Sequence, residues 1–168
     1  MKWIWMGAGT IAILVVFVLV VGWFMPVRHR ASRQATFRAD PASVWELITT
    51  VEAFPKWRGD VKGIERLPDR EGRPVWVEEG SNGRITYAVA RAEAPRELVV
   101  RIADVNLPFG GSWTYEISPV PGGSTLTITE DGEIYNPMFR VMSRFVFGYD
   151  STITAYLAAA EKRLAGGQ

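Results

Sequence analysis

The side chains in this sequence that could carry chemistry are carboxylates and phenols. The chain has 168 residues, no cysteine and a single histidine. This composition excludes disulfides, thiol nucleophiles and Cys-based zinc sites, and it leaves almost no room for a Ser-His-Asp triad. We therefore expect no bound metal and no cofactor. The single histidine, His29, lies in a basic flank, where contact with solvent or lipid headgroups is expected rather than catalysis.

Glu130 is a candidate acid or base because of its place in an alternating strand. Leu126 and Ile128 share one face of that strand and Glu130 continues it, so Glu130 points inward if this face is concave. An inward carboxylate near a phenol, Tyr87 or Tyr115, could support general acid and base chemistry with the phenol as proton donor. The alternative role for Glu130 is a structural hydrogen bond at the strand end.

Aromatic residues at alternate positions of two further strands would give a cavity apolar walls with phenol groups for polar contacts. For Trp113 and Ile117, plain core packing is the alternative. The residues predicted to contact a ligand are Trp113, Tyr115, Tyr87, Leu107, Phe109, Glu130, Met142, Phe145 and Tyr149.

Two segments carry more apolar side chains than a surface connection needs. The loop 106–111 presents Leu107 and Phe109 beside two glycines, and the helical stretch 138–147 is apolar nearly all round. A helix that is apolar on all sides is either buried or faces something other than water. We interpret the two segments as the mouth of an apolar cavity.

Two arginines, Arg140 and Arg144, lie one helical turn apart in this stretch. They could touch anionic headgroups or the acidic end of a ligand. The alternative interpretation of the same stretch is that Phe139 and Phe147 pack against the first helices of the domain.

An uncharged run near the N-terminus predicts a transmembrane anchor over residues 1–27. The run has 25 residues without a charge, whereas a helix needs only about 20 to cross a hydrocarbon core. Trp3 and Trp5 at one end lie about 30 Å along the helix from Trp23, which matches two interfacial aromatic belts. A cleavable signal peptide is the alternative, but this run is longer than the usual apolar core and no small-residue cleavage site follows it.

Residues 28–34 are predicted to form a basic, structureless linker after the anchor. Basic residues on this side slightly outnumber those before the anchor, which favours a cytoplasmic C-terminal domain. The side chains predicted to lie near the membrane are Trp3, Trp5, Trp23, Arg28, Arg30, Arg33, Arg140 and Arg144.

The charge balance differs between the flank and the rest of the chain. Four of the 19 basic residues and none of the 18 acidic residues precede Gln34, so the remainder has 15 basic residues and a formal charge of −3. An acidic domain argues against nucleic-acid binding.

The hydrophobic pattern beyond the linker predicts a short strand, two short helices, about six strands and one long helix. Asp40-Pro41 and Asn136-Pro137 are cap-and-proline signals that begin the first and the last of these helices, and Gly148 could kink or divide the last one. Glycine, proline and acidic turn residues separate the strands at short intervals, which favours an antiparallel meander. The predicted strands are Ala35–Arg38, Val61–Leu67, Pro74–Glu79, Arg84–Ala92, Glu97–Ala103, Gly111–Ser118 and Thr125–Ile134.

This order, with several short motifs, resembles the START/Bet v 1-like (SRPBCC) superfamily and within it the polyketide cyclase/dehydrase and lipid-transport group. The motifs are Val-Trp-Glu-Leu-Ile at 44–48, Phe-Pro-Lys-Trp at 54–57, Ala-Pro-Arg-Glu-Leu at 94–98 and Thr-Ile-Thr-Glu-Asp-Gly at 127–132. The resemblance implies an α+β helix-grip fold over residues 35–166, preceded by one transmembrane helix. In such a fold a curved antiparallel sheet of about seven strands wraps around the C-terminal helix. It carries over no universal catalytic residues.

Three functions fit these features. The leading hypothesis is membrane-anchored binding, extending to transfer, of a lipid or other hydrophobic small molecule in a cavity between the sheet and the C-terminal helix. The second is a metal-free cyclase or dehydratase that uses Glu130 and a tyrosine. The third is a non-catalytic module that binds a protein partner at the membrane. The sequence favours binding over catalysis and leaves the oligomeric state open.

Overall fold

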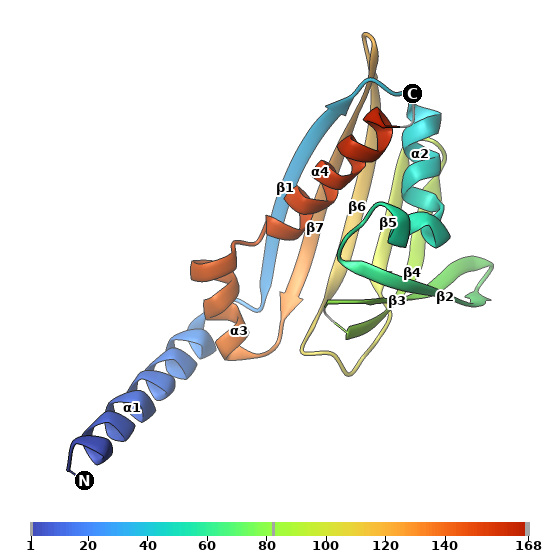
Figure 1. The fold of residues 1–168 in the computed structure, drawn as a ribbon. Helices are drawn as coiled ribbons and strands as arrows, with labels where there is room; N and C mark the ends of the chain where they lie inside the picture. The colour runs from blue at the N-terminus through green and yellow to red at the C-terminus, as the bar shows by residue number, and fades with distance from the viewer. Residues whose placement is uncertain (1, 82, 167–168) are drawn as a thin grey trace.

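A seven-stranded antiparallel sheet is the main element of the fold (Figure 1). The computed structural model describes residues 2–81 and 83–166, with side chains described from residue 13 onward. The strands follow the spatial order β1-β7-β6-β5-β4-β3-β2, so neighbours along the chain are neighbours in the sheet except at β1. The strands are β1 (Arg28–Phe37), β2 (Val61–Arg70), β3 (Arg73–Gly80), β4 (Gly83–Glu93), β5 (Glu97–Ile102), β6 (Phe109–Val120) and β7 (Gly123–Ile134).

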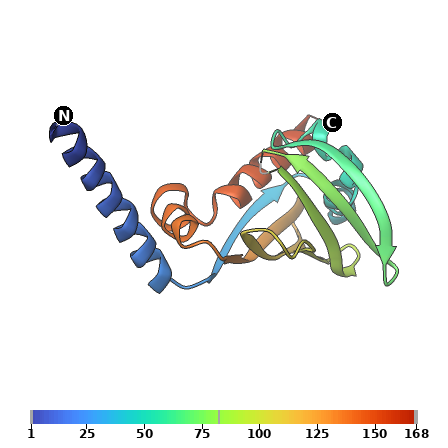
Figure 2. The ribbon, with the colours of Figure 1, turned by 90° about the horizontal axis from the view of Figure 1, so that it is seen from below.

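The helices lie at the two ends of the sequence and between the first two strands. Helix α1 projects away from the sheet, whereas α4 runs across the face that β1 and β7 present (Figures 1 and 2). The helices are α1 (Lys2–Phe24), α2 (Pro41–Thr49), the 3-10 helix η1 (Val51–Lys56), α3 (Pro137–Met142), the π-helical turn η2 (Ser143–Phe147) and α4 (Ser151–Ala165). The α+β helix-grip architecture expected from the sequence is therefore confirmed.

The first strand begins at Arg28 and pairs with β7 along its whole length. The prediction of a structureless linker over residues 28–34 is therefore corrected to a strand. Acidic side chains of β7 oppose the basic side chains of β1, and Arg28 Nε lies 3.0 Å from Glu133 Oε1. Cross-strand pairs of opposite charge stabilise a sheet, so a charge run that looks like a solvated flank is part of the fold.

Helix α1 carries the apolar N-terminal run. Large apolar side chains of its second half are exposed, Trp23 and Phe24 most of all. Among the residues whose side chains the structure describes, no helix is both long and apolar enough to span a membrane. The side chains of Trp3 and Trp5, predicted to lie at one membrane interface, are outside the described residues.

Hydrogen bonds from Arg140 connect α3 to the end of α1. Its guanidinium is buried and donates from Nη1 to the carbonyls of Gly22 (3.1 Å) and Met25 (3.2 Å), and from Nε to the carbonyl of Ile134 (2.7 Å). The last carbonyls of a helix need donor partners beyond its own backbone, and Arg140 donates to one in the last turn of α1 and to one just after the helix ends at Phe24. The prediction that Arg140 touches headgroups or a ligand is wrong, because backbone carbonyls occupy its donors.

The C-terminal helical pattern is divided, as Gly148 suggested. Asn136 caps α3 by accepting from the backbone N–H groups of Met138 (2.9 Å) and Phe139 (3.3 Å). Gly148 has φ 76°, a left-handed conformation that glycine adopts without strain, and it separates η2 from α4. The chain can therefore change direction between the segment beside α1 and the helix that covers the sheet.

The core lies between the concave face of the sheet and the helices α2 and α4. Alternation along the strands directs Ile117, Leu126 and Ile128 into it, as the sequence indicated, and all three are buried. Val44 of α2 and Ile153 of α4 cover them from the other side. Because the helices pack over one end of the sheet, the other end is left for a cavity.

Candidate functional site

Cross-strand register brings the aromatic side chains of the sheet together on its concave face. Trp113 on β6 lies directly opposite Glu130 on β7, and Tyr87 on β4 lies opposite Trp76 on β3. The rings of Trp76 and Tyr87 stack with centroids 5.8 Å apart, and Tyr87 lies the same distance from Trp113. Residues from four strands thus form one aromatic wall with a carboxylate at its edge.

A cavity of about 570 Å³ lies over this wall, a size typical of small-molecule sites. The segment from α3 to the start of α4 closes it opposite the sheet, and the loop that follows η1 closes its side. A smaller inner cavity of about 50 Å³ lies deeper beneath α4. The residues that line both are Arg58, Glu78, Tyr87, Trp113 and Thr152.

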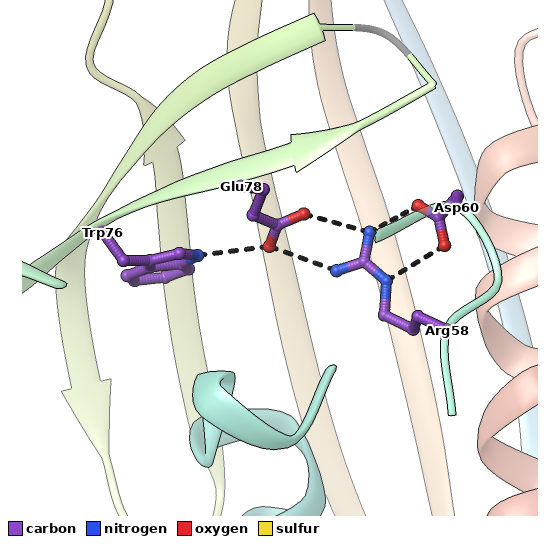
Figure 3. Close-up of polar contacts among 4 residues, drawn as sticks. All are labelled: Arg58, Asp60, Trp76 and Glu78. Atoms are coloured by element: carbon purple, nitrogen blue, oxygen red, sulfur yellow. Dashed lines mark hydrogen bonds and ion pairs between the residues drawn. The ribbon is translucent and has the colours of Figure 1, made fainter. Parts of the chain in front are cut away.

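An ion-pair cluster, in which Arg58 and Glu78 are mostly buried and Asp60 is exposed, lies between the two cavities (Figure 3). Arg58 donates from Nη2 to Asp60 Oδ2 (2.6 Å) and from Nη1 to Glu78 Oε1 (3.2 Å), and its Nη2 lies 3.1 Å from Glu78 Oε2. Trp76 Nε1 donates to Glu78 Oε1 at 3.2 Å. Burial by itself would lower the pKa of Arg58, but the hydrogen bond to Asp60 and the charge of Glu78 outweigh it and raise that pKa. Arg58 therefore stays charged in this part of the wall.

The three phenols around the inner cavity are held neutral. Burial is the main cause that raises the pKa of Tyr87, Tyr115 and Tyr156 far above the usual range of tyrosine. Such a phenol is a poor proton donor at neutral pH and serves better as a hydrogen-bonding group. This geometry does not favour the proton-donor role considered for Tyr87 and Tyr115.

His29 lies inside the larger cavity, beside Glu130. Its Nε2 lies 3.6 Å from Glu130 Oε1, and the two side chains are only 10% and 15% exposed. Its ring stacks on Tyr149 at a centroid distance of 4.2 Å. Within the described residues, the buried Nδ1 of His29 has no hydrogen-bond partner. The expectation that His29 faces solvent or headgroups is therefore wrong.

The structure brings together most of the residues predicted to contact a ligand. Tyr87, Trp113, Phe109, Glu130 and Tyr149 line the larger cavity, and Tyr115 lines the inner one. The remaining three, Leu107, Met142 and Phe145, line neither cavity. The Phe145 side chain points outward instead, with 71% of the residue exposed.

Sequence reasoning missed five charged or titratable residues that line the larger cavity: His29, Arg58, Asp60, Glu78 and Glu133. Alternation in Arg28–Phe37 could have found His29, because Ala31, Ala35 and Phe37 occupy the same face of that strand. No periodic pattern marks Arg58, which lies in the irregular segment between η1 and β2. Within the described residues, no group of three histidine, aspartate or glutamate side chains converges as a metal site would require.

The fold and the site define a helix-grip protein with a cavity on the concave face of its sheet, lined in part by aromatic side chains. The model of the family described as polyketide cyclase / dehydrase and lipid transport matches residues 28–163, and the chain belongs to that family. No curated protein matches the chain significantly.

Solved structures share the fold at low sequence identity. A START superfamily protein from Mycobacterium smegmatis is 19% identical with a TM-score of 0.69, covering 83% of this chain and 99% of its own. The Zhui aromatase/cyclase from a Streptomyces species is 14% identical with a TM-score of 0.65, over 82% and 94% of the two chains. Norcoclaurine synthase from Thalictrum flavum is 10% identical with a TM-score of 0.65, over 82% and 93%. At these identities the likeness concerns the fold alone.

Proposed function

We propose that this protein binds a hydrophobic small molecule, such as a lipid or a polyketide-like compound, while anchored in a membrane by α1. The observation that carries the proposal is the cavity of about 570 Å³, whose lining surface is mostly apolar although several charged side chains also line it. An apolar cavity with a few polar groups is what a hydrophobic ligand needs for affinity and orientation. The family description, which includes lipid transport, agrees with this role.

Membrane anchoring rests on the sequence of the N-terminal run and on the exposed apolar side chains of α1. Beside the end of α1, the α3–η2 segment exposes further large apolar side chains, among them Phe139, Phe145 and Phe147. Exposed apolar patches of this kind suit a membrane interface. We place the domain on the cytoplasmic side, since Arg28, Arg30 and Arg33 outnumber the positive charges before the anchor.

The same segment lines the cavity, and this supports uptake from the bilayer. Phe139 and Phe147 are exposed and also line the larger cavity, so they are not packed into the core against the first helices. Phe109 of the 106–111 loop lines the cavity from the sheet side. Anchoring would raise the concentration of a membrane-resident ligand next to this mouth.

Native mass spectrometry of the full chain, purified from its own membranes in mild detergent, tests the proposal. We expect an apolar small molecule to stay bound to the wild type and to be lost in Thr152→Trp, since Thr152 lines both cavities. Thr154→Trp is the matched control, because Thr154 lines neither cavity and is exposed on the same helix. Equal retention by the two variants, or no bound molecule in the wild type, would contradict the proposal.

A second candidate, a cyclase- or dehydratase-type enzyme, is favoured by the position of His29 beside Glu130. An imidazole and a carboxylate that are both mostly buried can exchange a proton with a ligand held against them. If the protein is such an enzyme, the bound molecule isolated from Glu130→Gln differs in structure from that isolated from the wild type. Identical bound molecules in the two samples would favour binding without catalysis.

A further inference from the structure

Arg58 contributes a guanidinium to the cavity lining, but two carboxylates already accept hydrogen bonds from it. Asp60 accepts from its Nη2 at 2.6 Å and from its Nε at 3.3 Å, while Glu78 accepts from its Nη1 at 3.2 Å (Figure 3). The same guanidinium lies over the rings of Phe54 and Tyr156, at 5.0 and 5.2 Å from their centroids. Two carboxylates therefore balance the single positive charge of the guanidinium, which has little attraction left for an anionic ligand.

The remaining charged groups of the larger cavity are mostly negative. Four carboxylates line it against one guanidinium and one imidazole, so its formal charge is −3 with the imidazole neutral and −2 with it protonated. The carboxylates are Asp60, Glu78, Glu130 and Glu133. Glu133 lies 3.0 Å from Arg28 outside the cavity, which leaves an excess of negative charge even when that pair is set aside.

Glu130 is the carboxylate that is free to meet a ligand. Its side chain is 15% exposed, and the ion-pair partner described for it is His29, at 3.6 Å. That distance exceeds hydrogen-bond length, and the pair carries opposite charges only when the imidazole is protonated. A carboxylate this deeply placed is costly without a cation or a donor. A ligand that supplies one would remove that cost.

Aromatic side chains lie beside Glu130 and His29 and elsewhere along the cavity wall. Trp113 lies directly opposite Glu130 in the sheet, and Tyr149 stacks on the far side of the pair, on His29. Phe109 and Phe147 line the cavity as well. Aromatic faces attract cations by their quadrupole, most strongly where water is displaced. An anion gains nothing from these rings and is repelled by the carboxylates.

We propose that the cavity selects hydrophobic ligands whose polar end is an amine or another cation, and that this end lies against Glu130. The inference rests on the proposed function, since it names the ligand class of that same cavity. The His29 Nδ1, buried and without a partner among the described residues, is a second polar atom that a ligand could engage there. The sequence led us to expect an arginine that binds the acidic end of a ligand. The inferred arrangement is the reverse: a carboxylate binds a cationic end.

The test uses the full chain in phosphatidylcholine nanodiscs and three probes that share one ring and tether length: tryptamine, tryptophol and indolepropionate. Titration calorimetry, with empty nanodiscs as the blank, gives each Kd near neutral pH, where these end groups are cationic, neutral and anionic. We expect tryptamine to bind at least about tenfold more tightly than indolepropionate, with tryptophol between them. Equal binding of the three probes, or tightest binding of the acid, would overturn the inference.

Glu130→Gln keeps the shape of the side chain and removes its charge. We expect the Kd values of tryptamine and indolepropionate to differ by no more than about threefold in this variant, whereas Glu116→Gln should keep the wild-type difference. Glu116 is the matched control because it lies exposed on the opposite face of β6 and the charge change is the same. An unchanged ratio in Glu130→Gln would contradict the role of Glu130.

The neutral probe separates this inference from the proposed function. If tryptophol binds and Thr152→Trp abolishes its binding, the apolar cavity is functional whatever the amine-to-acid ratio is. If none of the three probes binds to the wild type, both the proposed function and the ligand class inferred from it are refuted.

Discussion

Removing the guanidinium of Arg58 should destabilise the protein strongly, because it leaves a buried carboxylate without its cation. In Arg58→Met, Asp60 and Glu78 both lose their partner, but their environments differ. The Asp60 side chain is 53% exposed and the Glu78 side chain is 10% exposed. Loss of an exposed pair costs about 0–1 kcal/mol, whereas stranding one partner of a buried pair costs about 3–5 kcal/mol. The cost should therefore come almost entirely from Glu78.

The assay is thermal unfolding of the full chain in mild detergent, followed by tryptophan fluorescence. For a domain of this size, about 1 kcal/mol corresponds to about 2–4 °C in Tm, so we expect Arg58→Met to lower Tm by about 6–12 °C or more. Arg101→Met is the control, because Arg101 is exposed on β5 and away from both cavities. Its Tm should stay within about 2 °C of the wild type.

The double variant Arg58→Met/Glu78→Leu makes the reasoning refutable. Replacing both partners of a buried pair with apolar side chains of similar size is often neutral, so the double variant should recover most of the lost stability. A double variant less stable than Arg58→Met, or a single variant within about 1 kcal/mol of the wild type, would show that the stranded Glu78 charge is not what the guanidinium prevents.

Three further predictions concern other parts of the molecule. Gly22→Ala should lower Tm although alanine favours helices by about 1 kcal/mol, because a Cβ there would overlap the Pro137 carbonyl; a rise in Tm would contradict the close packing of α1 on α3. Hydrogen bonds from the backbone and side chain of Ser43 hold the pKa of Asp40 below its ordinary 3.8, so Asp40 stabilises the fold above that pH and loses this effect as the pH falls further. Asp40→Ala should accordingly lower Tm at neutral pH and do so less at strongly acidic pH, and a pH-independent difference would refute the cap. Because burial raises the pKa of Tyr115 far above its ordinary value, Tyr115→Phe should leave the ultraviolet titration of the folded protein unchanged up to about pH 11.

The strands and their faces could be predicted because they depend on local pattern. Alternation and turn residues located all seven strands to within a few residues at most ends, apart from the start of β1. The same alternation identified the faces on which Trp113 and Glu130 lie, as the register of β6 and β7 confirms. Local sequence also predicted the two helix starts that contain proline, because a cap residue and the first turn it stabilises are only a few residues apart.

The errors arise where a distant segment decides the outcome. The basic run at the start of β1 is stabilised by acidic side chains more than 100 residues away, as the pair Arg28 and Glu133 shows. Arg140 looks like a headgroup ligand in sequence, yet the carbonyls of Gly22 and Met25, also more than 100 residues away, bind it. Arg58 joins the site through tertiary contacts alone. A single sequence carries no local signal for such partners.

The hydrogen bonds that Arg140 makes to the end of α1 mean that the N-terminal helix cannot be removed without loss of contacts inside the folded domain. Cutting the chain before Arg28 would remove the Gly22 and Met25 carbonyls, so this guanidinium would keep only its hydrogen bonds to the carbonyls of Ile134 and Tyr135. The same cut would remove the Val27 carbonyl, which accepts from the backbone N–H of Ile134 at 2.8 Å. A shortened protein would therefore lose contacts at Ile134, which lines the larger cavity. The ligand affinity measured for it would differ from that of the full chain for this reason alone.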